Sequence, residues 1–151
     1  YESSASAIYF MMVEEDVVRI MQAPFTSIAS DGSTVNYAKD VPHLRNYGTF
    51  PRVLGKYVRE EGVLSLEQAI HKMTALPASR IDLETRGILA KGMIADISIF
   101  DQATVNDRDD WANPHQYATG FYYVIVGGTP VIDDGARTGS FPGKVLKKGS
   151  T

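Results

Sequence analysis

Hydrophobic positions recur with helical spacing in the first half of the chain and lie in short, strand-like runs in the second half. An apolar run over 7–13 predicts a strand or a passage from strand to loop. Three acids from Glu14 onward, followed by apolar positions on one face, predict a helix that ends before Pro24. A short buried strand is predicted over 26–29. The order strand, helix, strand with short links then indicates a βαβ unit with parallel strands.

Two further helices are predicted before the middle of the chain. The first begins at Pro51, because proline is favoured at the first helical position, and it ends before Gly62. The second begins at a capping box formed by Ser65 and Gln68 and ends before Pro77. The first half of the chain is therefore expected to be mainly helical.

The second half is expected to be mainly β-structure. Period-two alternation over 95–100 and apolar runs over 121–126 and 129–132 predict three strands. The pair Gly127-Gly128 separates the last two strands and predicts a two-residue hairpin turn. Residues 106–119 are predicted to be a loop that crosses between the first two strands.

Composition excludes several classes of function. The 151 residues carry a net charge of −3 without a large basic cluster, which argues against a nucleic-acid surface. Cysteine is absent, so a disulfide framework and a thiolate metal site are excluded. No apolar run approaches the length of a membrane span, and a cytoplasmic protein is the expectation. The start at Tyr1, in place of a methionine, is typical of a fragment.

Asp31 is the first candidate for chemistry. It follows the predicted strand over 26–29 and precedes Gly32, so its carboxylate is expected at the carboxyl end of that strand. In a barrel of parallel strands this end is the catalytic face. Asp-Gly after an apolar run is also a common turn signal, and these residues alone favour a plain turn.

The segment 32–50 is predicted to be a long loop directly after Asp31. It contains His43, Arg45 and Tyr47, and its aromatic residues argue against disorder. A loop of this length in a compact domain is usually functional or disordered. Taken singly, a histidine such as His43 is more often a surface or hydrogen-bonded side chain than a ligand, and an arginine such as Arg45 is more often a solvated charge than an anion-binding group.

Several motifs occur in a definite order along the chain. They are Ile-Ala-Ser-Asp-Gly over 28–32, His-Leu-Arg-Asn-Tyr-Gly-Thr-Phe-Pro-Arg over 43–52, a glycine-punctuated run ending in Ala-Asp-Ile over 86–97, and Asn-Pro-His-Gln-Tyr over 113–117. Together they resemble the N-acyl-D-amino-acid deacylases, or D-aminoacylases, of the metal-dependent amidohydrolase superfamily. The resemblance covers essentially the whole chain, and it indicates a C-terminal fragment of such a protein.

The resemblance implies a fold of class α/β plus β. Residues 1–85 would form the last strands and helices of a (β/α)₈ TIM barrel, and residues 86–151 the C-terminal share of a small β-sandwich. It also implies a zinc-dependent hydrolase that acts on linear amide C–N bonds and converts N-acyl-D-amino acids to a D-amino acid and a carboxylate.

The resemblance further implies roles for four residues. Asp31 would contact the metal-bound water and act as general base and then general acid. Arg45 or, as the second choice, Arg52 would bind the free carboxylate of the small-molecule N-acyl amino acid; Arg45 is preferred because it lies inside the loop. His43 would hold a substrate oxygen or orient Asp31, and Tyr47 would form a wall of the pocket. In this family most zinc ligands are histidines in a His-x-His pair and elsewhere, with a cysteine in D-aminoacylases.

The chain departs from that ligand pattern. It has no His-x-His pair and no cysteine, and its three histidines lack ligand spacing. The chain alone is therefore expected to be inactive, and a partial barrel with exposed apolar surface is expected to self-associate or to pair with the missing part. Two alternatives remain open: a cyclic-amide hydrolase related to hydantoinases and dihydroorotases, and a non-catalytic α+β binding module.

Overall fold

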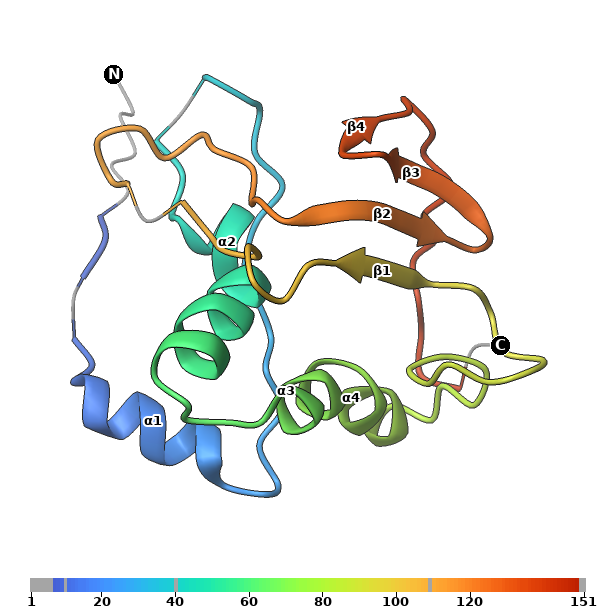
Figure 1. Ribbon diagram of the computed structural model, residues 1–151, viewed down its shortest axis with the longest axis horizontal. Coiled ribbons are helices and arrows are strands. Elements are labelled where there is room, and N and C mark those ends of the chain that lie inside the picture. Colours follow the sequence, from blue (N-terminus) through green and yellow to red (C-terminus); the bar gives the residue numbers. More distant parts are fainter. Residues whose placement is uncertain (1–6, 10, 40, 109, 150–151) are drawn as a thin grey trace, which may run out of the picture.

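The helices and the β-strands occupy separate parts of the molecule (Figure 1). This structure is a computed structural model that describes residues 7–9, 11–39, 41–108 and 110–149. Helices α1 to α4 form one part, and the four-stranded sheet forms another, beside α2 and above α3 and α4 in the view of Figure 1. The predicted change from a helical half to a β half is confirmed.

Helix α1, Glu14–Gln22, agrees with its prediction at both ends. Glu14, Glu15 and Asp16 occupy its first turn, where negative charge is favoured by the helix dipole. The chain leaves the helix at Ala23, whose backbone is extended, as is usual for a residue that precedes a proline.

The central helix begins earlier than predicted. Helix α2 is Arg45–Arg52, and it continues directly into a π-helix, η1, Val53–Glu60. Pro51 therefore lies inside a helix and not at its first position. The helix begins earlier because the amides of Tyr47 and Gly48 both donate to the Leu44 carbonyl, at 3.1 and 2.9 Å. The π-helical section begins two residues after Pro51, which has no N–H to continue the α-helical ladder.

Helix α3, Leu66–Met73, confirms the predicted capping box. The Ser65 hydroxyl accepts from the Gln68 amide at 3.2 Å, and the Ser65 amide donates to the Gln68 side chain at 2.9 Å. Helix α4, Ala75–Arg80, follows after one residue and contains Pro77. Pro77 lies in the first turn of α4, where its missing N–H leaves no hydrogen bond unmade.

The predicted strands over 7–13 and 26–29 are wrong for the residues that the structure describes, and so is the βαβ unit. Both segments are irregular, and neither pairs with a strand in that part of the chain. The Ile28 amide donates to the Lys72 carbonyl, at 3.0 Å, near the end of α3. Because a strand exists only through a ladder with a neighbour, these extended apolar segments have no sheet to join here.

The sheet confirms the three predicted strands. Strands β1, Ile97–Phe100, β2, Phe121–Val126, and β3, Thr129–Asp133, are antiparallel neighbours in chain order. Gly127 and Gly128 have φ of 55° and 83°, as a tight hairpin between right-twisted strands requires.

A two-residue strand that was not predicted, β4, Ala136–Arg137, adds to the edge of β3. The strands described here form one sheet, so the second layer of the predicted sandwich is not among them.

The principal core lies under the central helix. Val53, Tyr57 and Val58 of η1 pack with Leu64 and Ala69, and partly buried side chains of α1 cover this cluster. In the part that the structure describes, the loop between β1 and β2 is confirmed, and its residues 106–108 and 110–119 are called the crossing segment below. Within the described residues, no helix is long and apolar enough to cross a membrane.

Candidate functional site

The Asp31 backbone is held against the first turn of α2. Asp31 has a φ of 47°, in the left-handed region that aspartate tolerates better than most residues. The Ser33 amide donates to the Asn46 side-chain oxygen at 3.0 Å, and the Gly32 amide donates to the Ser30 hydroxyl at 3.2 Å. A side chain at Gly32 would lie 3.2 Å from the Asn46 Cα, so this close approach favours glycine.

Asp31 and Arg45 form an ion pair. The Arg45 guanidinium lies 3.0 Å from the Asp31 carboxylate, and the side chains are 44% and 84% exposed. The structure thus brings together two candidate residues that are 14 positions apart in the chain. Such an exposed pair contributes little to stability, so its interest lies in placing a cation beside the candidate base.

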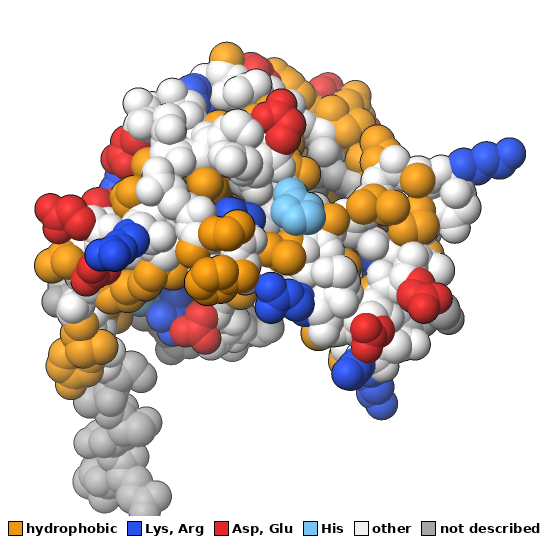
Figure 2. Space-filling view, turned by 90° about the horizontal axis from the view of Figure 1, so that it is seen from below, with side chains coloured by type: hydrophobic (Ala, Val, Ile, Leu, Met, Phe, Trp, Pro, Cys, Tyr) orange, Lys and Arg blue, Asp and Glu red, His pale blue; other side chains and the backbone are white. Residues whose placement is uncertain are grey.

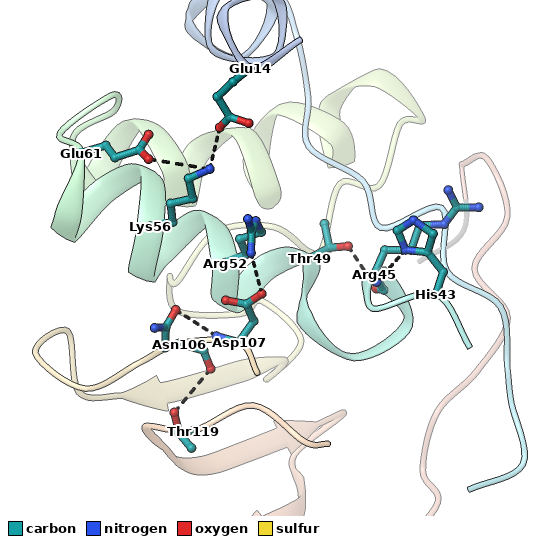
Figure 3. A network of polar contacts seen from close by, with 10 residues as sticks. All are labelled: Glu14, His43, Arg45, Thr49, Arg52, Lys56, Glu61, Asn106, Asp107 and Thr119. Atoms are coloured by element: carbon teal, nitrogen blue, oxygen red, sulfur yellow. Dashed lines mark hydrogen bonds and ion pairs between the residues drawn. The ribbon is translucent and has the colours of Figure 1, made fainter. Parts of the chain in front are cut away.

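His43 lies beside Arg45 and under the single tryptophan of the chain. Its Nδ1 accepts the Arg45 backbone N–H at 3.0 Å, and the Trp111 ring meets it edge-on at 5.1 Å between centroids (Figure 3 shows His43 and Arg45). Burial lowers the pKa of His43 below its ordinary value, Arg45 lowers it further, and Asp31 opposes this shift. His43 is therefore favoured as a neutral imidazole.

Tyr47 lies in a cluster of aromatic rings. Its hydroxyl shares a hydrogen bond of 2.9 Å with His115 Nδ1, and its ring meets Tyr117 edge-on at 5.6 Å. Burial raises the pKa of Tyr47, and the neighbouring Tyr117 and Tyr37 raise it further. Tyr47 therefore remains a phenol that can donate or accept a hydrogen bond near neutral pH.

A cavity of about 590 Å³ lies between α1, the segment 26–29 and α2. Most of its lining is apolar, and His43, Arg45 and Trp111 contribute polar and aromatic groups. Asp31 is not among the lining residues. The cavity has the size and mixed lining typical of small-molecule sites.

Sequence reasoning missed a second ion pair beside this cavity. Arg52 lies 3.1 Å from the carboxylate of Asp107, whose side chain is only 8% exposed. Figure 3 shows Arg52 pointing to Asp107, while Lys56 points away from it toward Glu14 and Glu61. A side chain at Gly48 would lie 2.8 Å from the Asp107 Cβ, so the position one turn before Arg52 requires glycine. This glycine is the feature of the sequence that could have indicated a close contact on this face of the helix.

The described residues do not form a metal site by themselves. No three His, Asp or Glu side chains gather closely enough there to hold an ion. A catalytic zinc usually takes three protein ligands, and the Asp31 carboxylate supplies at most one of them.

A comparison with family profiles matches residues 7–132 to the Amidohydrolase family, Amidohydro_3. The chain therefore belongs to the amidohydrolase family.

Three relatives from Alcaligenes xylosoxydans xylosoxydans match almost the whole chain. A D-aminoacylase is 46% identical over 144 residues, which cover 95% of this chain and 29% of that protein. An N-acyl-D-aspartate deacylase is 46% identical over 96% of this chain and 28% of its own length. An N-acyl-D-glutamate deacylase is 45% identical over 95% of this chain and 29% of its own length. The chain thus spans less than a third of the length of these relatives.

Solved structures agree with the sequence matches. A crystal structure of D-aminoacylase superposes with a TM-score of 0.81 at 44% identity and covers 87% of this chain and 27% of that one. A Bordetella bronchiseptica N-acyl-D-glutamate deacylase, complexed with zinc and a phosphonate inhibitor, superposes with a TM-score of 0.75 at 40% identity. This match covers 93% of this chain and 27% of that one. The structure therefore has the fold of the corresponding part of these amidohydrolases.

Proposed function

We propose that this chain is part of a hydrolase that cleaves the amide bond of N-acyl-D-amino acids, giving a D-amino acid and a carboxylate. The observation that carries the proposal is identity of 45–46% to three deacylases over at least 95% of the chain. Those three proteins are named for different substrates, and an N-acyl-D-amino acid is what the names have in common. A match to a Lactobacillus gasseri dihydroorotase is weaker, at 33% identity over 57% of the chain.

The proposed domain division follows the predicted boundary. Residues 1–85 belong to the final part of a TIM barrel and residues 86–151 to a β-sandwich, with other parts of the whole protein completing both. The helical first half and the antiparallel sheet of the second half support this division. The structural superposition on D-aminoacylase, which covers 27% of that chain, supports it as well.

Asp31 is proposed as the residue that moves the proton. Its carboxylate takes a proton from water as the water oxygen bonds to the acyl carbon of the substrate. When the C–N bond breaks, Asp31 returns that proton to the departing amine nitrogen. Its exposure supports this role, and so does its position between Ser30 and Ser33, which are hydrogen-bonded to Thr49 and Asn46 of α2.

The three remaining candidates are proposed to bind substrate. Arg45 has a geometry suited to the free carboxylate of an N-acyl amino acid, which would lie beside Asp31 because the two side chains are 3.0 Å apart. His43, as a neutral imidazole, and Tyr47, as a phenol, offer hydrogen bonds to the amide of the substrate.

Zinc is proposed as the cofactor of the whole protein. The N-acyl-D-glutamate deacylase structure contains zinc, and a D-aminoacylase is described with a binuclear metal center. The described residues of this chain do not fit a complete zinc site, so we assign to it only the Asp31 carboxylate. Zinc, when bound, supplies a Lewis acid that makes water a stronger nucleophile.

The test is hydrolysis of racemic N-acetyl amino acids by the zinc-loaded whole protein, read by chiral chromatography. We expect release of the D-amino acid alone, and a loss of about 10²- to 10⁴-fold in kcat for Asp31→Asn. Asp134→Asn is a matched control, because Asp134 also precedes a glycine and has a left-handed φ of 46°. This control should retain activity.

Two results contradict the proposal. Hydrolysis of hydantoins or dihydroorotate, without release of any amino acid from the linear substrates, would support the cyclic-amide alternative. No hydrolysis of either class by a folded, zinc-loaded protein would support a non-catalytic binding module.

A further inference from the structure

The crossing segment, residues 106–108 and 110–119, contacts the candidate substrate-binding residues from the β half of the chain. It leaves the sheet after β1, passes beside α2 and returns to β2 (Figure 1). His43 and Tyr47 each meet a different side chain of this segment. Residues far apart in sequence thus meet here, and His43 lies beside the Asp31–Arg45 pair.

The first contact is between Trp111 and His43. The rings meet at 80°, with centroids 5.1 Å apart, so the edge of one ring faces the other. The Arg45 backbone N–H also donates to His43 Nδ1, at 3.0 Å. Together these contacts limit both the position and the rotation of the imidazole.

The second contact is between His115 and Tyr47. Their polar atoms lie 2.9 Å apart, and their rings meet at 72° with centroids 5.9 Å apart. Tyr117 packs edge-on against Tyr47, with ring centroids 5.6 Å apart. Tyr117 also stacks on Tyr37 at 5.6 Å, so the irregular segment before α2 contributes a ring to the cluster. The Tyr47 hydroxyl is therefore held by one hydrogen bond, and its ring contacts the rings of His115 and Tyr117.

The crossing segment is itself fixed at its ends and near its middle. Asn106 and Thr119 form an antiparallel bridge, and Asp107 pairs with Arg52 at the end of α2. The Asp110 side chain accepts from the amides of Ala112 and Asn113 at 2.9 and 3.2 Å. A segment anchored in this way can hold other side chains in place.

We propose that the crossing segment positions His43 and Tyr47 for substrate binding, with Trp111 and His115 as the positioning residues. The inference rests on the proposed function and extends it, since it assigns part of the substrate site to the β half of the chain. Neither Trp111 nor His115 needs to touch substrate, because each acts through the residue that it contacts.

The test compares His115→Phe, His115→Asn and Tyr47→Phe in the zinc-loaded whole protein. Loss of the hydrogen bond in His115→Phe should raise KM for an N-acetyl-D-amino acid about 3- to 10-fold, with kcat nearly unchanged. Asparagine places an amide atom near the position of Nδ1, so His115→Asn should recover most of the lost affinity. The double variant Tyr47→Phe/His115→Phe should be no worse than the poorer single variant, because the two residues share one interaction.

Additive effects in the double variant, or a His115→Asn variant as poor as His115→Phe, would overturn the inference. His71→Phe is the control, because His71 is exposed on α3 and outside the cluster, and it should leave KM unchanged.

Hydrogen–deuterium exchange tests the positioning of His43 and Tyr47 independently of the proposed hydrolase activity. Absence of hydrolysis by the wild-type protein contradicts the proposed function alone. Exchange in the same variants still tests the positioning, and His115→Phe should raise exchange locally at residues 43–47. Unchanged exchange at 43–47, or a uniform rise along the whole chain, would overturn the inference.

Discussion

At the scale of single residues, His43 is the titrating group whose surroundings are best defined. Its pKa is lowered from 6.5, first by burial and then by Arg45. The unfolded chain takes up this proton near the ordinary value, while the folded chain does so only at lower pH. Between the two pKa values the unfolded state binds more protons, so the free energy of unfolding should fall as pH falls below about 6.5.

Urea unfolding at pH 7.5 and pH 5.5 measures this effect, with fluorescence of the single tryptophan, Trp111, as the signal. The wild-type chain should lose more stability between these two pH values than His43→Gln. His71→Gln, at an exposed histidine, should behave like the wild type. Equal pH dependence in the wild type and His43→Gln would contradict the assignment.

Residue identities pointed to the candidate site, but their contacts did not follow from the sequence. Asp31, His43, Arg45 and Tyr47 stand out by type and order. The Asp31–Arg45 pair depends on where α2 begins, and that start is determined by two amides that share the Leu44 carbonyl. The Asp107 and His115 contacts depend on tertiary packing between the two halves, which local patterns do not contain.

At the scale of elements, one face of the central helix carries Gly48, Arg52, Gly55 and Arg59, all in contact with residues 102–107. The two glycines allow close approach, and the two arginines bind a carboxylate and backbone carbonyl groups. A Cβ at Gly55 would clash with the Asn106 side-chain oxygen and would lie 3.0 Å from the Val105 carbonyl oxygen. The stripe therefore joins the helical half to the β half.

Gly55→Ala should destabilise the chain by about 1–3 kcal/mol, because the Val105 backbone cannot yield without moving the crossing segment. Helix propensity alone predicts the opposite sign, since alanine is favoured over glycine in a helix by about 1 kcal/mol. Gly143→Ala, where nothing lies within 4 Å of the added Cβ, should change stability by less than about 0.5 kcal/mol. Chemical denaturation measures both, and a stabilised Gly55→Ala variant would contradict the packing described here.

Elements governed by local chemistry agreed with prediction, and predicted strands formed only where the chain provides a neighbouring strand. The Ser65–Gln68 capping box and the Gly127-Gly128 hairpin are short-range signals, and both are confirmed. The strands over 7–13 and 26–29 need neighbouring strands, and the described residues provide none. Proline is favoured at the first position of a helix, and the sequence therefore predicts that the central helix starts at Pro51. The helix instead starts at a turn formed around the Leu44 carbonyl, six residues earlier.

At the scale of the whole molecule, apolar surface remains exposed around α1. Met11, Ile20 and Phe25 are 82%, 51% and 69% exposed. Ile20 also lines the cavity of about 590 Å³. Figure 2 views the molecule from below and shows hydrophobic side chains at the surface among charged ones. Several large apolar side chains exposed near one helix are typical of an interface.

We therefore predict that the 151-residue chain self-associates through the α1 face. Size-exclusion chromatography with light scattering should give a mass above the 16.6 kDa of one chain. Ile20→Glu should shift the population toward the monomer, because a carboxylate placed in a buried apolar contact is strongly disfavoured. Val145→Glu, at a residue 88% exposed near the C-terminal end, should leave the association unchanged. A monodisperse wild-type monomer, or equal effects of both substitutions, would show that the α1 face does not drive association.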